Sequence, residues 1–274
     1  MTKPIMIQGT ASGVGKTMLT LALCRIFKQD GYLVAPFKAQ NMTANTRTTP
    51  DGHEIAVSQW LQAMAAGVEP TPDMNPIILT PGKNGTRVVL GGKEYDTINA
   101  YNFKEIKARL VPEISKAYAR LCASYDIIVI EGAGSPVELN LNKNDIVNMG
   151  MAKTANAPVL LVADIDRGGV FASLYGTIML LDEGDKERVK ATIVNRFRGE
   201  PDYFADGVKI LEDITDKPVA GVIPFLQINL PEEDGLFADT FTDTNYEAEF
   251  DKIANHVRKA INMDLIYKIL ESEV

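Results

Sequence analysis

The sequence lacks any apolar run long enough to cross a bilayer, and Met1–Ile7 is too short, with Gly9 following too soon, to be a signal peptide. It also lacks an excess of positive charge, because 28 Lys and Arg stand against 36 Asp and Glu, for a formal net charge of −8. Proteins that bind nucleic acid usually present a basic face. We therefore expect a cytoplasmic protein that binds neither nucleic acid nor membrane and meets any anionic ligand at a local positive site.

Cysteine is scarce as well. Cys24 and Cys122 are the 2 cysteines, and neither stands in a C-x-x-C spacing, so we expect no cysteine metal site and no disulfide framework, in agreement with a reducing compartment. Repeats and low-complexity tracts are also missing. The share of 46% hydrophobic and 23% charged residues is that of an ordinary globular protein.

Short apolar or β-branched runs alternate with helical stretches along the chain. Such runs beside Gly, Asp, Asn or Pro predict buried parallel strands, and their alternation with helices predicts right-handed crossovers. We therefore expect an α/β fold with a doubly wound, mostly parallel sheet. The predicted strands are Pro4–Ile7, Tyr32–Ala35, Ile127–Ile130, Pro158–Ala163, Ala191–Val194 and Val219–Ile223, and the predicted helices are Lys16–Gln29, Glu54–Ala66, Phe103–Ser124, Asp145–Ala155, Val170–Leu181 and Tyr203–Ile214.

Residues 86–96 interrupt this alternation. Gly91-Gly92 between Val88–Leu90 and Lys93–Tyr95 is typical of a two-residue hairpin turn, which we interpret as an insertion at the edge of the sheet. The acidic stretch Glu232–Thr244 is predicted to be a loop, and apolar residues at helical spacing in Tyr246–Leu270 predict a closing helix. We expect residues 1–274 to form a single P-loop domain.

The strongest motif is Gly9–Thr17, which follows a predicted strand and begins a predicted helix, as a phosphate-binding loop requires. Its glycines let backbone N–H groups turn toward phosphate oxygens, Lys16 reaches the terminal phosphates, and Thr17 offers a hydroxyl to magnesium. Five residues separate Gly9 from the Gly-Lys pair where the strict pattern has four. The motif predicts binding of a nucleoside triphosphate with Mg²⁺, through Gly9, Thr10, Ser12, Gly13, Val14, Gly15, Lys16 and Thr17.

Magnesium held against a triphosphate needs carboxylates at the carboxyl ends of neighbouring strands. Glu131 ends the predicted strand Ile127–Ile130 and is our first candidate, although a carboxylate there can also cap the following turn. Asp51 is a second candidate for the metal, with a turn or helix N-cap as the alternative.

Five further residues carry charges near strand or helix ends. Asp145 opens a predicted helix and is either a functional acid or an N-terminal helix acid. Asp164, Asp166 and Arg167 end another strand, which suggests an anion clamp or an ordinary ion pair. Lys38 follows the second predicted strand and so points to the same edge as the phosphate loop, where it can bind phosphate or a substrate carboxylate.

Several longer segments together resemble the ATP-dependent amidoligase domain of the cobyric acid synthase family, in the wider group that includes cobyrinic acid a,c-diamide synthase and dethiobiotin synthetase. The resemblance covers roughly Ile5 to Asp234, and these segments are far more specific than a phosphate loop alone. They are Gly9–Thr17, Pro36–Met42, Asp73–Pro76, Glu131–Pro136, Asn144–Gly150, Ala163–Phe171, Val194–Gly199 and Leu230–Asp234.

The resemblance implies a dethiobiotin synthetase-like P-loop fold in which ATP phosphorylates a corrinoid side-chain carboxylate and ammonia then displaces phosphate to form an amide. It implies that Lys16 and Thr17 hold the triphosphate and Mg²⁺, with Asp51 and Glu131 as further metal ligands. Asn195 matches the residue that reads adenine. Asp145 matches an acid associated with substrate phosphorylation, and Lys38 faces the reacting phosphate, so the implied catalytic residues are Lys16, Lys38 and Asp145.

Full-length members of the family also carry a glutaminase domain with a Cys nucleophile and a His base. This sequence contains His53 and His256 as its 2 histidines, and its cysteines fall in predicted helices. We therefore expect that ammonia comes from a separate glutaminase or from solution, or that the chain is an excised domain or has another role. The resemblance also implies a homodimer.

Two other functions remain open. One is a dethiobiotin synthetase-like ligase that acts on a small carboxylate, and the other is a nucleotide-switch ATPase of the partition or metal-chaperone type. Switch proteins commonly carry a second lysine early in the phosphate loop, and Thr10-Ala11-Ser12 has none, which favours the ligase.

Overall fold

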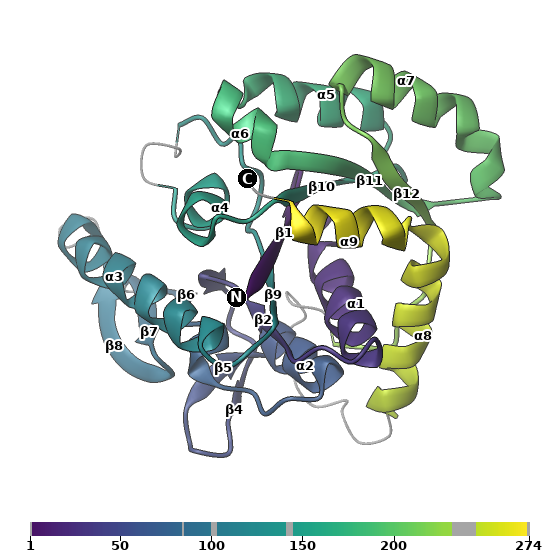
Figure 1. Ribbon diagram of the computed structural model, residues 1–274. Coiled ribbons are helices and arrows are strands. Elements are labelled where there is room, and N and C mark those ends of the chain that lie inside the picture. Colours follow the sequence, from purple (N-terminus) through teal and green to yellow (C-terminus); the bar gives the residue numbers. More distant parts are fainter. Residues whose placement is uncertain (1, 84, 100–102, 141–144, 232–244, 273–274) are drawn as a thin grey trace.

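The computed structural model describes residues 2–83, 85–99, 103–140, 145–231 and 245–272 (Figure 1). Six parallel strands form the central sheet in the order β12-β11-β10-β1-β9-β2. This sheet, with helices between its strands, confirms the predicted doubly wound α/β fold. The strands are β1 (Lys3–Gly9), β2 (Val34–Phe37), β9 (Ile127–Glu131), β10 (Val159–Asp164), β11 (Val189–Phe197) and β12 (Val219–Pro224).

Helices cover both faces of this sheet because its inner strands are apolar on both sides. Ile5 and Ile7 of β1 belong to one buried cluster, whereas Met6 between them belongs to the other. The first cluster packs under α1 (Lys16–Gln29), α2 (Val57–Ala66), α8 (Tyr246–Ala260) and α9 (Met263–Glu271), and the second under α3 (Phe103–Cys122), α4 (Met149–Ala155), α5 (Val170–Leu180) and α7 (Ala205–Thr215).

Two smaller sheets follow β2. One has the order β3-β6-β7-β8, and the other pairs β4 with β5. Gly91 and Gly92 have φ values of 55° and 75°, which a two-residue hairpin of the primed type requires, so the predicted hairpin is confirmed. Its place at the edge of the main sheet was wrong, since it lies in the separate four-stranded sheet. The strands are β3 (Gln40–Met42), β4 (Thr46–Thr48), β5 (Glu54–Ala56), β6 (Ile77–Gly82), β7 (Gly85–Leu90) and β8 (Lys93–Ile98).

Some predicted boundaries were wrong. The helix expected over Glu54–Ala66 starts at Val57, because Glu54–Ala56 pairs with β4 as a strand. The single closing helix is two helices, α8 and α9. Ile261 pairs with Gly221, and the N–H of Asn262 donates to Ala220 O at 2.7 Å. The chain between the two helices therefore bonds to β12 and does not continue as a helix.

The remaining elements are short. The helix predicted at Tyr203–Ile214 is a 3₁₀ turn, η3 (Pro201–Phe204), followed by α7, and another 3₁₀ turn, η1 (Pro72–Met74), and a six-residue helix, α6 (Glu183–Arg188), complete the described elements. The predicted loop Glu232–Thr244 lies outside the described residues. In the described part of the chain, no helix combines the length and the apolar character of a membrane span.

Candidate functional site

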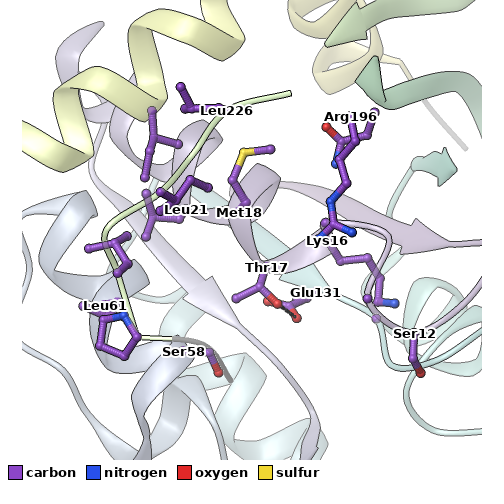
Figure 2. Close-up of a pocket in the computed structure, with 18 of the residues that line it drawn as sticks. Ser12, Lys16, Thr17, Met18, Leu21, Ser58, Leu61, Glu131, Arg196 and Leu226 are labelled. Atoms are coloured by element: carbon purple, nitrogen blue, oxygen red, sulfur yellow. Dashed lines mark hydrogen bonds between the residues drawn. The ribbon is translucent and has the colours of Figure 1, made fainter. Parts of the chain in front are cut away.

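A pocket of about 780 Å³ lies at the carboxyl ends of β1 and β9, beside the first turn of α1 (Figure 2). Ligands of doubly wound sheets bind at this edge, and the volume falls within the range of small-molecule sites. The phosphate loop and polar side chains line one part of the pocket. Apolar side chains from α1, α2, α8 and the segment after β12 line the other part, including Leu21, Leu61, Ile253, Leu226 and Leu230.

The phosphate loop is shaped by its glycines. Gly13 and Gly15 have φ values of 71° and 101°, which side chains rarely adopt. A Cβ on Gly9 would lie 2.5 Å from Val14 Cγ2, so this position also has no room for a side chain. Ser12, Gly13, Gly15, Lys16 and Thr17 line the pocket, whereas Gly9, Thr10 and Val14 form the loop without lining it.

Lys16 is the first cation of the site. It is 7% exposed, and its Nζ donates to Ala11 O at 2.9 Å and to Gly134 O at 3.0 Å. The side chain therefore spans the space between the phosphate loop and the loop after β9. This holds the ammonium at the pocket wall where phosphate oxygens would lie.

Glu131 is the centre of the polar part of the pocket. Its Oε1 accepts hydrogen bonds from Thr17 Oγ1 and Lys38 Nζ, each at 2.9 Å. The side chains of Glu131 and Lys38 are 0% and 6% exposed, so they form a buried ion pair. The fold thus brings together three residues that the sequence placed on three different predicted elements.

Gln62 completes this cluster and was missed by the sequence analysis. Its Nε2 donates to Glu131 Oε2 at 2.6 Å and to Thr17 O at 3.4 Å. In the sequence it is one polar residue in a predicted amphipathic helix, where most such residues face solvent. No sequence signal separated it from an exposed glutamine, because its partner Glu131 lies 69 residues further along the chain.

The donor set of Thr17 and Glu131 suits a magnesium ion. Mg²⁺ prefers oxygen ligands at about 2.0–2.1 Å in octahedral geometry, which places neighbouring ligands roughly 2.9 Å apart. The distance from Thr17 Oγ1 to Glu131 Oε1 is 2.9 Å. Among the described residues, no three His, Cys, Asp or Glu side chains gather as a metal site.

Asn195, near the end of β11, also lines the pocket. Its Nδ2 donates to Val14 O at 2.8 Å, and its buried Oδ1 has no hydrogen-bond partner. A Cβ on Gly15 would lie 2.1 Å from this Nδ2, so Asn195 needs a glycine there. An unpaired buried acceptor is costly, which fits a group that receives its donor from a ligand.

The strand-end charges of Asp164 and Asp166 are held in ion pairs. Arg196 Nη1 donates to Asp164 Oδ2 at 3.0 Å, and Arg198 Nη2 donates to Asp166 Oδ2 at 3.0 Å and lowers the pKa of that carboxyl. Arg167 lies 3.4 Å from the same oxygen of Asp164. Arg167 and Arg196 nevertheless line the pocket and add positive charge to it.

Asp145 holds a loop before α4. Its Oδ1 accepts from the N–H groups of Val147 and Asn148, and its Oδ2 accepts from Gly150, all at 2.9 Å. The expected helix start at Asp145 was wrong, because these bonds place α4 from Met149 onward. Asn148 Nδ2 in turn donates to Ala133 O at 2.6 Å, which connects this loop to the one after Glu131. Asp145 itself does not line the pocket, and its catalytic role stays a prediction.

Asp51 lies in the turn between β4 and β5, and the structure does not bring it to Glu131 and Thr17. Its carboxylate pairs with His53 Nδ1 at 2.6 Å and accepts from Thr49 Oγ1, and 58% of its side chain is exposed. These two bonds lower its pKa. Asp51 is not among the residues that line the pocket, so the metal role implied for it stays a prediction without support from this geometry.

Comparison with known proteins agrees with a nucleotide site. The family model described as the CobQ/CobB/MinD/ParA nucleotide binding domain matches residues 5–235. A curated cobyric acid synthase from Ruminiclostridium cellulolyticum is 53% identical over 237 residues, which are 86% of this chain and 46% of the relative. Another, from Caldanaerobacter subterraneus, is 48% identical over 269 residues, 97% of this chain and 53% of the relative. The chain spans about half the length of the curated relatives it matches.

Solved structures are more distant. MinD from Pyrococcus horikoshii with Mg-ADP aligns over 94% of this chain and 97% of that chain, with 19% identity and a TM-score of 0.44. A ParA family ATPase from Chlorobium tepidum aligns over 98% of this chain and 96% of that chain, with 11% identity and a TM-score of 0.47.

Proposed function

The chain belongs to the CobQ/CobB/MinD/ParA nucleotide-binding domain family, and from that premise we propose that it binds ATP with Mg²⁺ and activates a corrinoid side-chain carboxylate for amide formation. The curated relatives, which share about half of their length with this chain, are cobyric acid synthases. Their name supports a corrinoid acid as the substrate and an amide-forming ligase as the class of enzyme.

The observation that carries this proposal is the position of Lys38 beside Glu131 and Thr17 in the same pocket as Lys16. A carboxylate and a triphosphate repel each other, so their reaction needs fixed cations between them. Lys16 belongs to the phosphate loop, whereas Lys38 follows β2 and pairs with Glu131. A second buried lysine at this point suits the transferred phosphoryl group or the substrate carboxylate.

Thr17 and Glu131 would hold the magnesium ion, with their oxygen atoms already at the spacing of neighbouring ligands. When bound, Mg²⁺ would neutralise charge on the β- and γ-phosphates. Asn195, whose Oδ1 is buried without a partner, would accept a hydrogen bond from the adenine amino group. Thr17, Glu131 and Asn195 all line the same pocket.

The proposed reaction proceeds through an acyl phosphate. A carboxylate oxygen attacks the γ-phosphorus, the bond to the β–γ bridging oxygen breaks, and ADP leaves. Ammonia then attacks the carbonyl carbon, phosphate leaves, and loss of a proton from nitrogen gives the amide. Lys16 and Lys38 hold the anionic groups in place during both steps.

Ammonia would come from a glutaminase or from solution. We further propose a homodimer located in the cytoplasm, where ATP is available. Two alternatives are less well supported: Ala11 occupies the place where nucleotide-switch proteins commonly carry a second lysine, and the curated relatives favour a corrinoid over a small carboxylate.

The test is phosphate release from Mg-ATP by the purified chain, with ammonia, in the presence and absence of cobyrinic acid a,c-diamide. Mass spectrometry of the corrinoid follows each reaction. Corrinoid-dependent phosphate release, matched one to one by replacement of carboxyl OH with NH₂, is the expected result. Equal phosphate release with and without corrinoid, and no amide product, would contradict the proposal.

A further inference from the structure

Four polar side chains form a buried chain of hydrogen bonds that leads from the pocket wall to Glu131. Asn41 Nδ2 donates to Gln59 Oε1 at 2.9 Å, Gln59 Nε2 donates to Gln62 Oε1 at 3.4 Å, and Gln62 Nε2 donates to Glu131 Oε2 at 2.6 Å. Ser58 Oγ also donates to Gln59 Oε1, at 3.1 Å. We call Asn41, Ser58, Gln59 and Gln62 the amide relay.

The relay is unusual for its burial. Gln59 and Gln62 are both 0% exposed, Asn41 is 2% and Ser58 is 4%. The neighbouring α2 residues Leu61 and Ala65 belong to the apolar core, so the helix places two amides where it otherwise places hydrocarbon. A buried amide is destabilising unless it has hydrogen-bond partners, whereas an apolar side chain would fill this space without needing any. Packing alone therefore does not explain the two glutamines. Their hydrogen bonds, which lead to Glu131, do.

The carboxylate determines the direction of every bond in the relay. A carboxylate accepts hydrogen bonds and donates none, so the amide nitrogen of Gln62 must face Glu131. Its oxygen then faces Gln59 and must accept, which directs the nitrogen of Gln59 toward Gln62 and leaves the oxygen of Gln59 for Asn41 and Ser58. All donors of the relay thus point toward Glu131, and each bond fixes the orientation of the next side chain in the series.

Gln62 also separates the two oxygens of Glu131 by role. Oε2 is occupied by Gln62, whereas Oε1 faces Thr17 Oγ1 and Lys38 Nζ. The same Gln62 nitrogen lies 3.4 Å from the backbone oxygen of Thr17. Gln62 therefore contacts both partners of the proposed metal site and sets the orientation in which Oε1 faces the Thr17 hydroxyl.

From this arrangement we propose that Gln62, supported by Gln59 and Asn41, is a positioning residue that holds Glu131 so that Oε1 alone binds Mg²⁺ with Thr17. The proposal rests on the Mg-nucleotide site of the proposed function and is independent of the corrinoid reaction. It extends the site to Gln59 and Gln62, which are not among the residues that line the pocket. Outer-shell partners of metal ligands typically change metal affinity by about 10–100-fold when they are lost.

The test measures ATP binding by calorimetry as a function of Mg²⁺ concentration, and again in EDTA. Gln62→Met keeps the length of the side chain and removes the donor, so we expect the half-saturating Mg²⁺ concentration to rise by about tenfold or more. Affinity for ATP in EDTA should change less than about twofold, because Gln62 does not touch the phosphate loop amides. An equal loss in EDTA and in Mg²⁺, or no loss in either, would overturn the proposal.

Two further variants keep the test decisive if Gln62→Met folds poorly. Gln59→Met leaves the bond to Glu131 intact and should raise the Mg²⁺ requirement in the same direction by about threefold, since its effect passes through Gln62. An unchanged Mg²⁺ requirement for Gln59→Met would overturn the relay. Gln29→Met is the matched control, because Gln29 donates to Asp251 at 2.8 Å on the exposed side of α1, and it should behave as wild type.

Discussion

Lys38 Nζ lies 2.9 Å from Glu131 Oε1, and neither side chain is more than 6% exposed. Removing one member of a buried ion pair leaves the other charge without compensation, which typically costs about 3–5 kcal/mol. The pair joins the end of β9 to the residue that follows β2. The same ion pair therefore contributes both to the stability of the fold and to the wall of the pocket.

The first prediction concerns this pair. Lys38→Met should lower the free energy of unfolding by about 3–5 kcal/mol, because Glu131 would remain buried and charged. The double variant Lys38→Met/Glu131→Gln should recover most of that loss, since it buries no charge. Urea unfolding of the wild type, both single variants and the double variant measures the coupling. Additive losses would show that the two side chains do not interact.

The second prediction concerns the hydroxyl of Thr17. Thr17→Val keeps the shape of the side chain and removes the oxygen that lies 2.9 Å from Glu131. We expect Mg²⁺-dependent ATP turnover to fall by about a hundredfold or more, since loss of a metal contact is worth several kcal/mol. Thr17→Ser retains the hydroxyl and should keep most of the rate. Similar rates for the Val and Ser variants would exclude a metal role for Thr17.

The third prediction concerns base selectivity. Asn195 holds Val14 O through its nitrogen and leaves Oδ1 buried without a partner. Asn195→Ala should weaken ATP binding by about tenfold, corresponding to roughly 1.4 kcal/mol for a lost hydrogen bond. Binding of GTP should change much less, so the preference for ATP narrows. Parallel titrations with the two nucleotides test this, and an equal loss for both would assign Asn195 to loop structure alone.

The sequence predicted the main sheet well because its strands are local signals. Each inner strand is a short apolar run, and the phosphate loop is recognised from contiguous residues. The sequence-based prediction was wrong where the same local pattern is compatible with two different structures. Glu54–Ala56 continues the apolar spacing of α2, yet it pairs with β4, and Asn262 ends one helix by bonding to Ala220. Ala220 lies far from Asn262 in the sequence, whereas β4 lies only a few residues before Glu54, so in that case a local hairpin competed with the helix and was missed.

The site was predicted in part for the same reason. Lys16, Thr17 and Glu131 follow from a contiguous motif and a strand end, whereas Gln62 depends on the distance between α2 and β9. Asp145 illustrates the opposite case, because its short carboxylate side chain bonds to backbone N–H groups three and five residues ahead. Sequence patterns do not distinguish an aspartate that holds a loop through backbone hydrogen bonds from an aspartate that acts in catalysis.

The fourth prediction concerns acid stability. Arg87 donates to both oxygens of Glu54, at 3.0 and 2.7 Å, and thereby joins β5 to β7 across two sheets. This pairing is the main reason that the pKa of Glu54 lies below its ordinary value of 4.5. Because the folded-state pKa is the lower one, the contribution is present above about pH 4.5 and is lost as the pH falls through the folded value.

Wild-type protein should therefore lose stability below pH 4.5 more steeply than Glu54→Gln, which has no carboxyl to protonate. Urea midpoints from pH 7 to pH 3 measure both curves. The control is Glu105→Gln, because Glu105 and its partner Arg109 are 67% and 58% exposed on α3 and contribute little. Parallel curves for wild type and Glu54→Gln would mean that the Arg87 pair does not contribute to the acid limb. If the urea midpoint falls less steeply with decreasing pH in Glu54→Gln but not in Glu105→Gln, part of the acid destabilisation comes from protonation of Glu54 between β5 and β7.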